Sequence, residues 1–311
     1  MPLCPKEHRS PKNSRALAAT SALVLLAAFL AACMPGRATA QDCKLTDKVT
    51  GKTFRVFEIM GYRNIPDLGT HCVESLKIWY AHEFWPEGAP SRKDFDLGLP
   101  DRDLVERVGR RAPEFGEITV LDIEHWPVGD ATMADAAVDN HITVLDWFRK
   151  SAPQDHAVGY YSMLPIRNYW GAVRGKDDPK YQSWQAQNDR LERLADEVDI
   201  VFPSIYTFYE DQEGWLDYAK AQIDESRRLA PDKPVYVFLW PEYHPSNDER
   251  AGEPIEAGYW RVQLDFLREH ADGVVIWTID TTKAIDFADI PPWWAETERF
   301  IDDGFECEGC S

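Results

Sequence analysis

The chain has 311 residues, 44% of them hydrophobic, and its 53 acidic residues outnumber its 34 lysines and arginines. This length and composition allow one large hydrophobic core. Residues 1–40 hold five of the basic residues and one of the acidic ones, so the rest of the chain carries 29 basic against 52 acidic residues, a formal net charge of −23. Such a surface disfavours nucleic acids and other polyanions at long range, so we expect no nucleic-acid partner.

Residues 1–40 are typical of an export signal. Four basic residues precede the apolar run 16–32, which is short for a membrane span. Two processing sites fit. The sequence LAAC at 30–33 matches a complete bacterial lipobox, which we favour and which would place a lipid on Cys33; the sequence ATA at 38–40 matches an A-x-A site. We expect an exported protein in the periplasm or at the cell surface, bound to the membrane only through this lipid, or otherwise secreted.

Strand and helix patterns alternate along residues 41–303. We expect strands at 54–60, 78–80, 118–121, 157–162, 199–203, 235–239 and 273–277. We expect helices at 101–111, 130–150, 181–197, 212–229, 255–270 and 292–301. The strands are apolar throughout, as in a parallel sheet buried on both faces. This pattern predicts an α/β fold: one TIM-like (β/α) barrel domain, distorted and with about seven strands, followed by a cysteine-containing tail at 304–311.

Four cysteines remain after the signal, namely Cys43, Cys72, Cys307 and Cys310. An even number in an exported protein indicates disulfides. Two arrangements fit the sequence: Cys43–Cys72 with Cys307–Cys310, or cross-pairs that join the two ends of the chain. The C-x-x-C spacing of Cys307 and Cys310 lies in the tail and does not open a helix after a strand, so we expect no redox role.

The strand at 118–121 leads into two carboxylates, Asp122 and Glu124. Residues i and i+2 of a strand point the same way, roughly 6–7 Å apart. In a parallel α/β barrel the carboxyl ends of the strands carry the chemistry. Two carboxyl groups in different environments are the basic tool for breaking a glycosidic bond. We therefore take Asp122 and Glu124 as the candidate catalytic pair.

The other strand ends contribute mostly carboxylates, phenols and indoles. These candidate substrate-binding residues are Glu58, Tyr62, Tyr160, Tyr161, Tyr206, Trp240, Glu242, Trp277 and Asp280. Aromatic faces stack on sugar rings, and phenol hydroxyls can orient them. His125 stands alone after the acid pair, without the cluster of His or Cys that holds a metal, so we expect no metal and no cofactor. The set favours a polysaccharide or oligosaccharide substrate.

Five motifs in order resemble the hyaluronidases of animals and venoms, over residues 118 to 278. The resembling segments are VLDIEHW at 120–126, HAVGYY at 156–161, NDRL at 188–191 with FPSIY at 202–206, PVYV at 234–237 and GVVIW at 273–277. Each motif is short, but each lies at an expected strand or just before one. Residues 41–117 show no clear match.

The resemblance implies a distorted seven-stranded barrel and a retaining, substrate-assisted mechanism, in which the substrate's own acetamido carbonyl attacks the anomeric carbon. It implies that Glu124 is the acid and then the base, and that Asp122 orients and stabilises the acetamido group. Tyr206 would support that group, and Trp277 would form the floor of the cleft. Chitinase-like enzymes also end a motif in D-x-E, but Val120 stands where their middle Asp should be, so this match is weaker.

The chain also departs from the hyaluronidase pattern. Pro127 and Trp240 occupy the places of two family arginines that could meet a uronate carboxylate. We therefore expect a neutral or amine-bearing hexosamine polymer, unless another basic residue such as Arg63 or Arg167 reaches the cleft. Two alternatives stay open. One is a glycosidase on a sugar without an acetamido group, with Asp122 as nucleophile or base; the other is a carbohydrate-binding barrel lipoprotein that has lost catalysis.

Overall fold

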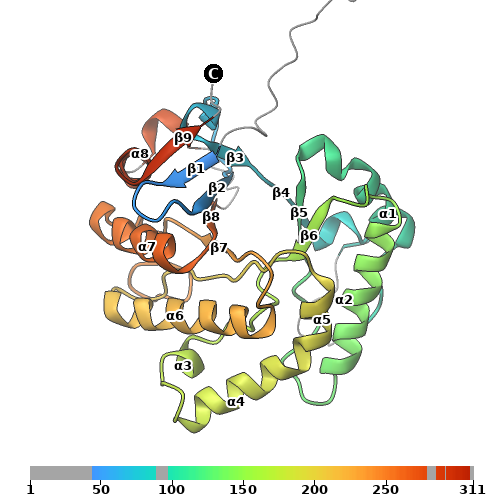
Figure 1. The fold of residues 1–311 in the computed structure, drawn as a ribbon. Helices are drawn as coiled ribbons and strands as arrows, with labels where there is room; N and C mark the ends of the chain where they lie inside the picture. Colours follow the sequence, from blue (N-terminus) through green and yellow to red (C-terminus); the bar gives the residue numbers. More distant parts are fainter. Residues whose placement is uncertain (1–43, 89–96, 279–284, 291, 309–311) are drawn as a thin grey trace, which may run out of the picture. The chain divides into compact units, whose positions relative to one another are not determined.

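The computed structural model describes residues 44–88, 97–278, 285–290 and 292–308 (Figure 1). The expected signal segment with Cys33, and also Cys43, Cys310 and Asp280, lie outside the described residues. The strands are β1 (Lys44–Asp47), β2 (Thr53–Ile59), β3 (Val73–Ser75), β4 (Lys77–Tyr80), β5 (Ile118–Asp122), β6 (Ala157–Tyr160), β7 (Tyr236–Leu239), β8 (Gly273–Trp277) and β9 (Phe305–Glu308). The α-helices are α1 (Arg102–Arg111), α2 (Ala134–Arg149), α3 (Tyr169–Ala172), α4 (Pro179–Asn188), α5 (Glu192–Glu197), α6 (Gln212–Leu229), α7 (Ala257–His270) and α8 (Trp293–Gly304).

Most expected elements are confirmed, because their local signals agree with their burial. Helix α1 begins after Asp101, whose carboxylate accepts hydrogen bonds from the backbone N–H groups of Asp103 and Leu104. Helix α6 and strand β8 have the expected bounds. Strand β5 buries all of its first four residues, as expected from its apolar run.

Three expectations are corrected. The single helix expected at 181–197 is divided into α4 and α5 by a 3₁₀ turn at Asp189–Leu191. Residues 199–203 form no regular strand and make isolated bridges instead. Residues 305–308, expected to belong to a tail, form β9, which pairs antiparallel with β1. Both β1 and β9 are short and partly polar, so neither carries the apolar run by which the other strands were found.

The strands form two sheets. The larger sheet has the order β7-β8-β2-β1-β9, with β3 also paired to β2, and the smaller has the order β4-β5-β6. The pairs β7–β8, β8–β2, β2–β3, β4–β5 and β5–β6 are all parallel. The parallel core and the alternation with helices establish an α/β fold with mixed sheets.

Single backbone contacts connect the two sheets. On one side, Tyr161 at the end of β6 bridges Phe202, while Val201 bridges Val235 just before β7. On the other side, Leu76, which separates β3 from β4, donates its N–H to the carbonyl of Glu58 at 3.0 Å. These contacts are not continuous ladders, so the closed barrel stays a prediction.

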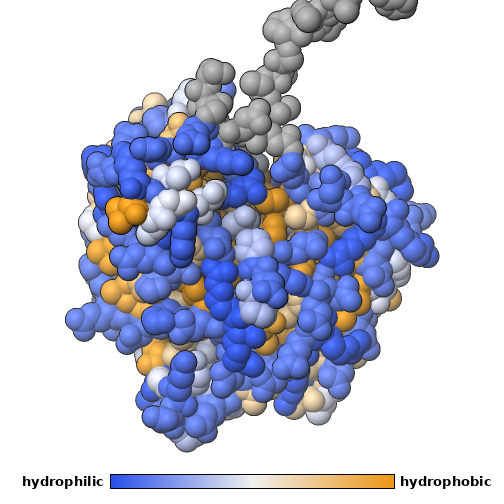
Figure 2. Space-filling model, in the orientation of Figure 1, coloured by the Kyte–Doolittle hydropathy of each residue, from blue (hydrophilic) through white to orange (hydrophobic). Residues whose placement is uncertain are grey.

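Buried side chains divide into an outer and an inner cluster. The larger, outer cluster includes Val56, Leu121 and Val237 and extends to buried helix residues such as Trp215. The inner cluster draws alternate residues from facing strands: Phe57, Val120, Phe202, Phe238 and Val275. Side chains alternate along a strand, so the cluster to which a residue belongs tells which way it points. Outside these cores, Figure 2 shows mostly hydrophilic side chains on one face, in keeping with the high charge.

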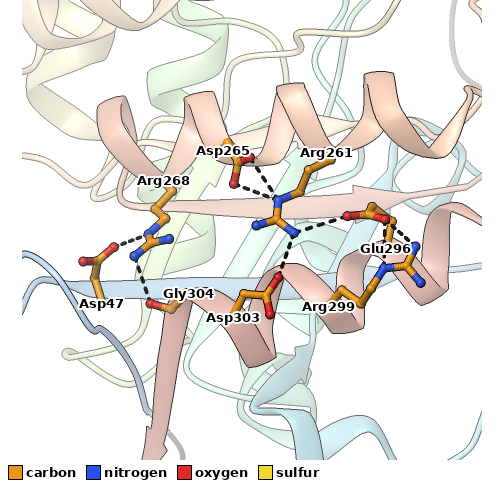
Figure 3. A network of polar contacts seen from close by, with 8 residues as sticks. All are labelled: Asp47, Arg261, Asp265, Arg268, Glu296, Arg299, Asp303 and Gly304. Carbon is orange, nitrogen blue, oxygen red and sulfur yellow. Dashed lines mark hydrogen bonds and ion pairs between the residues drawn. The ribbon is translucent and has the colours of Figure 1, made fainter.

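The two ends of the described chain are held together covalently and by ion pairs. Cys72 and Cys307 form a disulfide across 235 residues of sequence, which selects a cross-pair and excludes the Cys43–Cys72 pairing. Beside it, Arg268 of α7 contacts Asp47 of β1 and donates to the carbonyl of Gly304 at 3.0 Å (Figure 3). A second arginine of α7, Arg261, bonds to three carboxylates, which belong to Asp265, Glu296 and Asp303 (Figure 3).

Candidate active site

The acid pair lies at the carboxyl end of β5. Ile118 and Val120 belong to the inner cluster, and Asp122 continues their row by the alternation of the strand. Glu124 follows two residues later, beyond the end of the strand, and both carboxylates are half-buried. Ile123 between them is fully buried. One strand end therefore carries two partly buried carboxylates, two residues apart in the chain.

Three aromatic rings pack together at the same end of the inner cluster. The rings of Tyr206 and Trp277 stack with centroids 5.8 Å apart and an interplanar angle of 19°. Trp240 stands edge-on to both, 5.6 Å from Tyr206 and 5.2 Å from Trp277. The indole N–H of Trp277 donates to the hydroxyl of Tyr80 at 3.0 Å. We call Tyr206, Trp240 and Trp277 the aromatic floor.

Electrostatic coupling joins the acid pair to this floor. Burial raises the pKa of Tyr206 well above its usual value, with Tyr161 and Asp122 adding to the effect. Burial likewise raises the pKa of Tyr161 to about 12, and Glu124 contributes. The two phenol rings lie 6.3 Å apart, and the Tyr161 hydroxyl donates to Ser204 at 3.1 Å. Both phenols therefore stay protonated at neutral pH, as hydrogen-bond donors beside the carboxylates.

A buried imidazole lies against the backbone between the two acids, and as a neutral ring it donates to one of two carbonyl oxygens. A ring nitrogen of His141, on α2, lies 3.2 Å from the carbonyl oxygen of Ile123, and the other lies 2.8 Å from the carbonyl of Ala137. Burial lowers the pKa of His141 to about 4, so the ring is neutral at neutral pH. Its edge-to-face contacts with Trp126 and Tyr160, both at 4.7 Å, hold it in place. His141 was missed because a histidine within an amphipathic helix carries no signal of its partner.

Two expected site residues face away from this cluster. Tyr160 lies on the outer face of β6, where its hydroxyl donates to the carbonyl of His141 at 2.9 Å, and it is 1% exposed. Glu58 lies between the inward-facing Phe57 and Ile59 and therefore points outward. Its carboxylate accepts hydrogen bonds from the Ser75 hydroxyl and from the backbone N–H of Met60. The structure does not bring either residue to the acid pair.

Tyr62 and Glu242 lie near each other. Glu242 continues the inward row after Trp240, and burial raises its pKa. Burial also raises the pKa of Tyr62 to about 12, with a contribution from Glu242. Tyr62 packs against Phe287 and Trp293, so its ring is part of the surrounding core.

Arg167 and His244 also belong to the site and were not assigned to it from the sequence. Burial by itself lowers the pKa of an arginine, but Tyr161 and Glu124 raise the pKa of Arg167 above its usual value. Burial and then Arg167 lower the pKa of His244 to about 4, and its ring lies 6.3 Å from Tyr206. A basic residue five positions after the strand-ending motif at 157–162 was the available signal for Arg167.

The described residues contain no group of three His, Cys, Asp or Glu side chains that could hold a metal ion. Cavities of 530 and 550 Å³ lie at the opposite, amino-terminal ends of the strands, and share Pro153, Asp155 and His156 in their linings. Arg55 in the first of these cavities is already paired with Glu74. Neither cavity is lined by Asp122 or Glu124.

No family model matches the chain. An S-adenosylmethionine decarboxylase proenzyme of Sulfolobus acidocaldarius is 36% identical over 50 residues, a match that spans 16% of this chain and 41% of that relative. Among solved structures, a glucosidase from Croceicoccus marinus has a TM-score of 0.46 at 9% identity, covering 76% of this chain and about half (52%) of its own.

Two other solved structures are similar at the same level. A β-glucanase from Saccharophagus degradans, in complex with cellotetraose, has a TM-score of 0.43 at 12% identity and covers 84% of this chain and 92% of its own. A β-mannanase from the blue mussel Mytilus edulis has a TM-score of 0.33 at 9% identity, with 84% and 94% covered. These three structures are enzymes named for carbohydrate substrates. Likenesses this low assign neither family nor substrate to this chain.

Proposed function

We propose that this protein is a glycoside hydrolase that cleaves a polysaccharide containing N-acetylhexosamine. The observation that carries the proposal is the coupling of two half-buried carboxylates to one aromatic cluster: Asp122 to Tyr206, and Glu124 to Tyr161, with the two phenol rings 6.3 Å apart. Two carboxyl groups serve the breaking of a glycosidic bond. Aromatic faces suit the apolar faces of sugar rings.

The proposed mechanism retains the anomeric configuration. The carbonyl oxygen of the substrate's acetamido group attacks the anomeric carbon while Glu124 gives its proton to the glycosidic oxygen, so that bond breaks and a cyclic intermediate forms. Asp122 accepts the acetamido N–H and stabilises the positive charge, while the protonated Tyr206 donates to the acetamido oxygen. Water then gives a proton to Glu124 and attacks the anomeric carbon. This breaks the bond between that carbon and the acetamido oxygen and restores the acetamido group.

The proposed framework for this chemistry is a distorted barrel of about seven strands. The parallel ladders, together with the bridges of residues 201–204 and the Leu76–Glu58 contact, support it. In such a barrel the carboxyl ends of the strands surround one opening, which accounts for the meeting of Asp122, Tyr206, Trp240 and Trp277.

The resemblance to hyaluronidases supports the mechanism more than the substrate. Trp240, in the place of a family arginine, is 5% exposed and packs edge-on against Tyr206 and Trp277. The chain therefore has no cation at this place, where the family has one. Arg167 does reach the site, but its charge is coupled to Glu124 and Tyr161. Together with the acidic surface, the missing cation at Trp240 favours a neutral or amine-bearing hexosamine polymer over a uronate polymer.

The export and lipid anchor on Cys33 belong to the same proposal. Within the ranges that the structure describes, no helix has the length and apolar character needed to cross a membrane. A Cys33→Ala variant should move from the membrane fraction to the soluble fraction of the expressing cell. Its continued recovery with membranes would contradict the anchor.

A depolymerisation screen tests the function. Chitin, chitosan, hyaluronan, chondroitin and glucans would be incubated with the protein, and products followed by mass spectrometry and by NMR of the newly formed anomeric centre. We expect hexosamine-terminated products with retained configuration. Release of inverted products, or cleavage only of polymers without acetamido groups, would favour the alternative in which Asp122 acts as base or nucleophile. No cleavage with retained binding would favour the inactive carbohydrate-binding barrel.

A further inference from the structure

Two large aromatic side chains remain exposed beside the site. Trp170 is 56% exposed and Tyr209 is 37% exposed. Trp170 lies on α3, in the connection that follows the carboxyl end of β6, and Tyr209 follows the bridged residues 201–207. Their rings are 5.5 Å apart. Both therefore belong to connections at the carboxyl ends of the strands, the end that carries the acid pair. We call them the exposed aromatic pair.

The two rings of the exposed aromatic pair pack against a third aromatic residue, Tyr169. Tyr169 lies against both of its rings, 5.2 Å from Trp170 and 5.1 Å from Tyr209. Tyr169 in turn packs on Phe208 and Tyr218, at 5.8 and 5.2 Å. Helix α3 lies beside α4 and α6 (Figure 1). A partly buried ring below and neighbouring helices beside it limit the freedom of the exposed rings, which lowers the entropy cost of binding a ligand on them.

The backbone leading into α3 is also held. The backbone N–H of Ile166 donates to Asn188 at 2.9 Å, and its carbonyl accepts from the indole of Trp184 at 2.7 Å. Asn168 caps the short helix by accepting from the N–H of Gly171 at 2.9 Å. Trp170 therefore stands on a connection that is anchored on both sides.

An unbroken series of ring contacts joins the exposed aromatic pair to the aromatic floor. From Tyr169 the series continues to Phe208, which lies 4.8 Å from His244. His244 lies 6.3 Å from Tyr206 and 6.2 Å from Trp240, both of which belong to the floor. Isolated surface aromatics are common and require no explanation. Here the exposed rings continue a row of ring contacts that starts at the aromatic floor.

The charge around the exposed aromatic pair narrows the class of ligand. Tyr209 is followed by the exposed carboxylates of Glu210 and Asp211. Glu210 is paired with Arg250, and Asp211 caps α6. Burial, with a smaller contribution from Asp211, raises the pKa of Tyr169 to about 12. A carboxylate or sulfate on a sugar would approach these acids unfavourably. A neutral sugar ring meets no electrostatic repulsion from these acids, and an ammonium group on a sugar would be attracted to them.

We propose that Trp170 and Tyr209 form a distal subsite on which a neutral or amine-bearing sugar ring of a polymeric substrate stacks. The inference rests on the proposed function and deepens it, because the substrate is then a chain long enough to reach from the acid pair to α3. The apolar face of the sugar covers the exposed ring surface, and a short substrate that fills only the floor does not reach it.

The test measures binding apart from cleavage. Affinity electrophoresis in gels containing chitosan or hyaluronan reports polymer binding, and an aryl glycoside of di-N-acetylchitobiose reports cleavage of a short substrate. The variants are Trp170→Ala, Tyr209→Ala and the conservative Trp170→Phe. The matched control is Phe115→Ala, which truncates another aromatic side chain of 37% exposure just before the amino-terminal end of β5. Thermal unfolding of each variant checks the fold.

We expect each alanine variant to weaken chitosan binding and raise KM for the polymer about three- to tenfold, the loss of one ring contact, with kcat unchanged. Cleavage of the short glycoside should not change, Trp170→Phe should retain most of the binding, and Phe115→Ala should match the wild type. Equal polymer binding by wild type and Trp170→Ala overturns the inference, as does preferred binding of hyaluronan or no binding of chitosan by the wild type.

The two proposals fail separately. Polymer binding that depends on Trp170, without cleavage of any polymer or glycoside, upholds the subsite and overturns the hydrolase proposal. Cleavage that is indifferent to Trp170 and Tyr209 upholds the hydrolase proposal and overturns the subsite.

Discussion

Replacing the disulfide with Cys72→Ala and Cys307→Ser should lower the free energy of unfolding without changing the fold. The bond closes a loop of 235 residues, for which the chain-entropy relation gives about 5 kcal/mol of destabilisation of the unfolded chain. Measured values fall below such estimates, so we expect a loss of about 2–5 kcal/mol. The native ends stay together in the variant because β1 still pairs with β9 over four residue pairs, and Arg268 still contacts Asp47.

The assay is urea unfolding of wild type and double variant under oxidising conditions, followed by tryptophan fluorescence and far-UV circular dichroism. With a slope of about 3 kcal/mol per molar urea for a chain of this size, the midpoint should fall by about 1 M. Under reducing conditions the wild type should approach the variant. A midpoint difference near zero in oxidising buffer would refute the reasoning, because it would mean that the cross-link does not restrict the unfolded chain. A changed native spectrum would instead show that the bond is needed to form the fold.

Four further predictions concern the site and the ion pairs. Glu124→Gln should retain sugar binding and lose turnover by about 10² or more, the contribution of a general acid; near-full kcat would show that Glu124 is not the acid. A thiazoline mimic of the cyclic intermediate should bind the wild type far more tightly than substrate does, and the Asp122→Asn variant should lose this difference in affinity. A covalent sugar trapped on Asp122 would contradict this. Trp240→Arg should raise the kcat/KM ratio of uronate to neutral polymer, most at low salt, whereas a wild-type preference for the uronate polymer would contradict the expected charge selection. The contact with Arg268 holds the pKa of Asp47 well below its usual value, so the stabilisation by the ionised carboxylate is full above about pH 4 and is lost as the pH falls below that value. Asp47→Asn should therefore lower the free energy of unfolding by about 1–3 kcal/mol at pH 7 and by much less at pH 2. Equal losses at both pH values would contradict this linkage.

Local sequence was sufficient for most of the secondary structure. Apolar runs bounded by Pro and Gly marked β5, β7 and β8, and the segments between the strands were correctly expected to hold α6 and α7. The acid pair was predicted from its place at the end of a buried strand, and its catalytic role stays a prediction. The two short strands β1 and β9 escaped detection because four residues with mixed polarity carry no periodic signal, and their pairing supplies the order.

Which face each strand residue occupies was decided only by the tertiary structure. A parallel strand buried on both faces has no alternation of polar and apolar residues, so nothing local distinguishes Tyr160 from Tyr161. The structure turns Tyr160 outward to His141 and Tyr161 inward to Ser204, and it turns Glu58 outward in the same way.

The sequence by itself indicated the α/β class, most of the elements and the candidate acid pair, because these depend on residues near one another in the chain. The partner of Cys72, the place of Arg167 beside Glu124 and the row of rings from Tyr206 to Trp170 depend on segments that are far apart in sequence. Such contacts form only when the connections after separate strands are brought to the same end of the sheets. Their residue types are compatible with many pairings, and only the packing of the folded chain selects one.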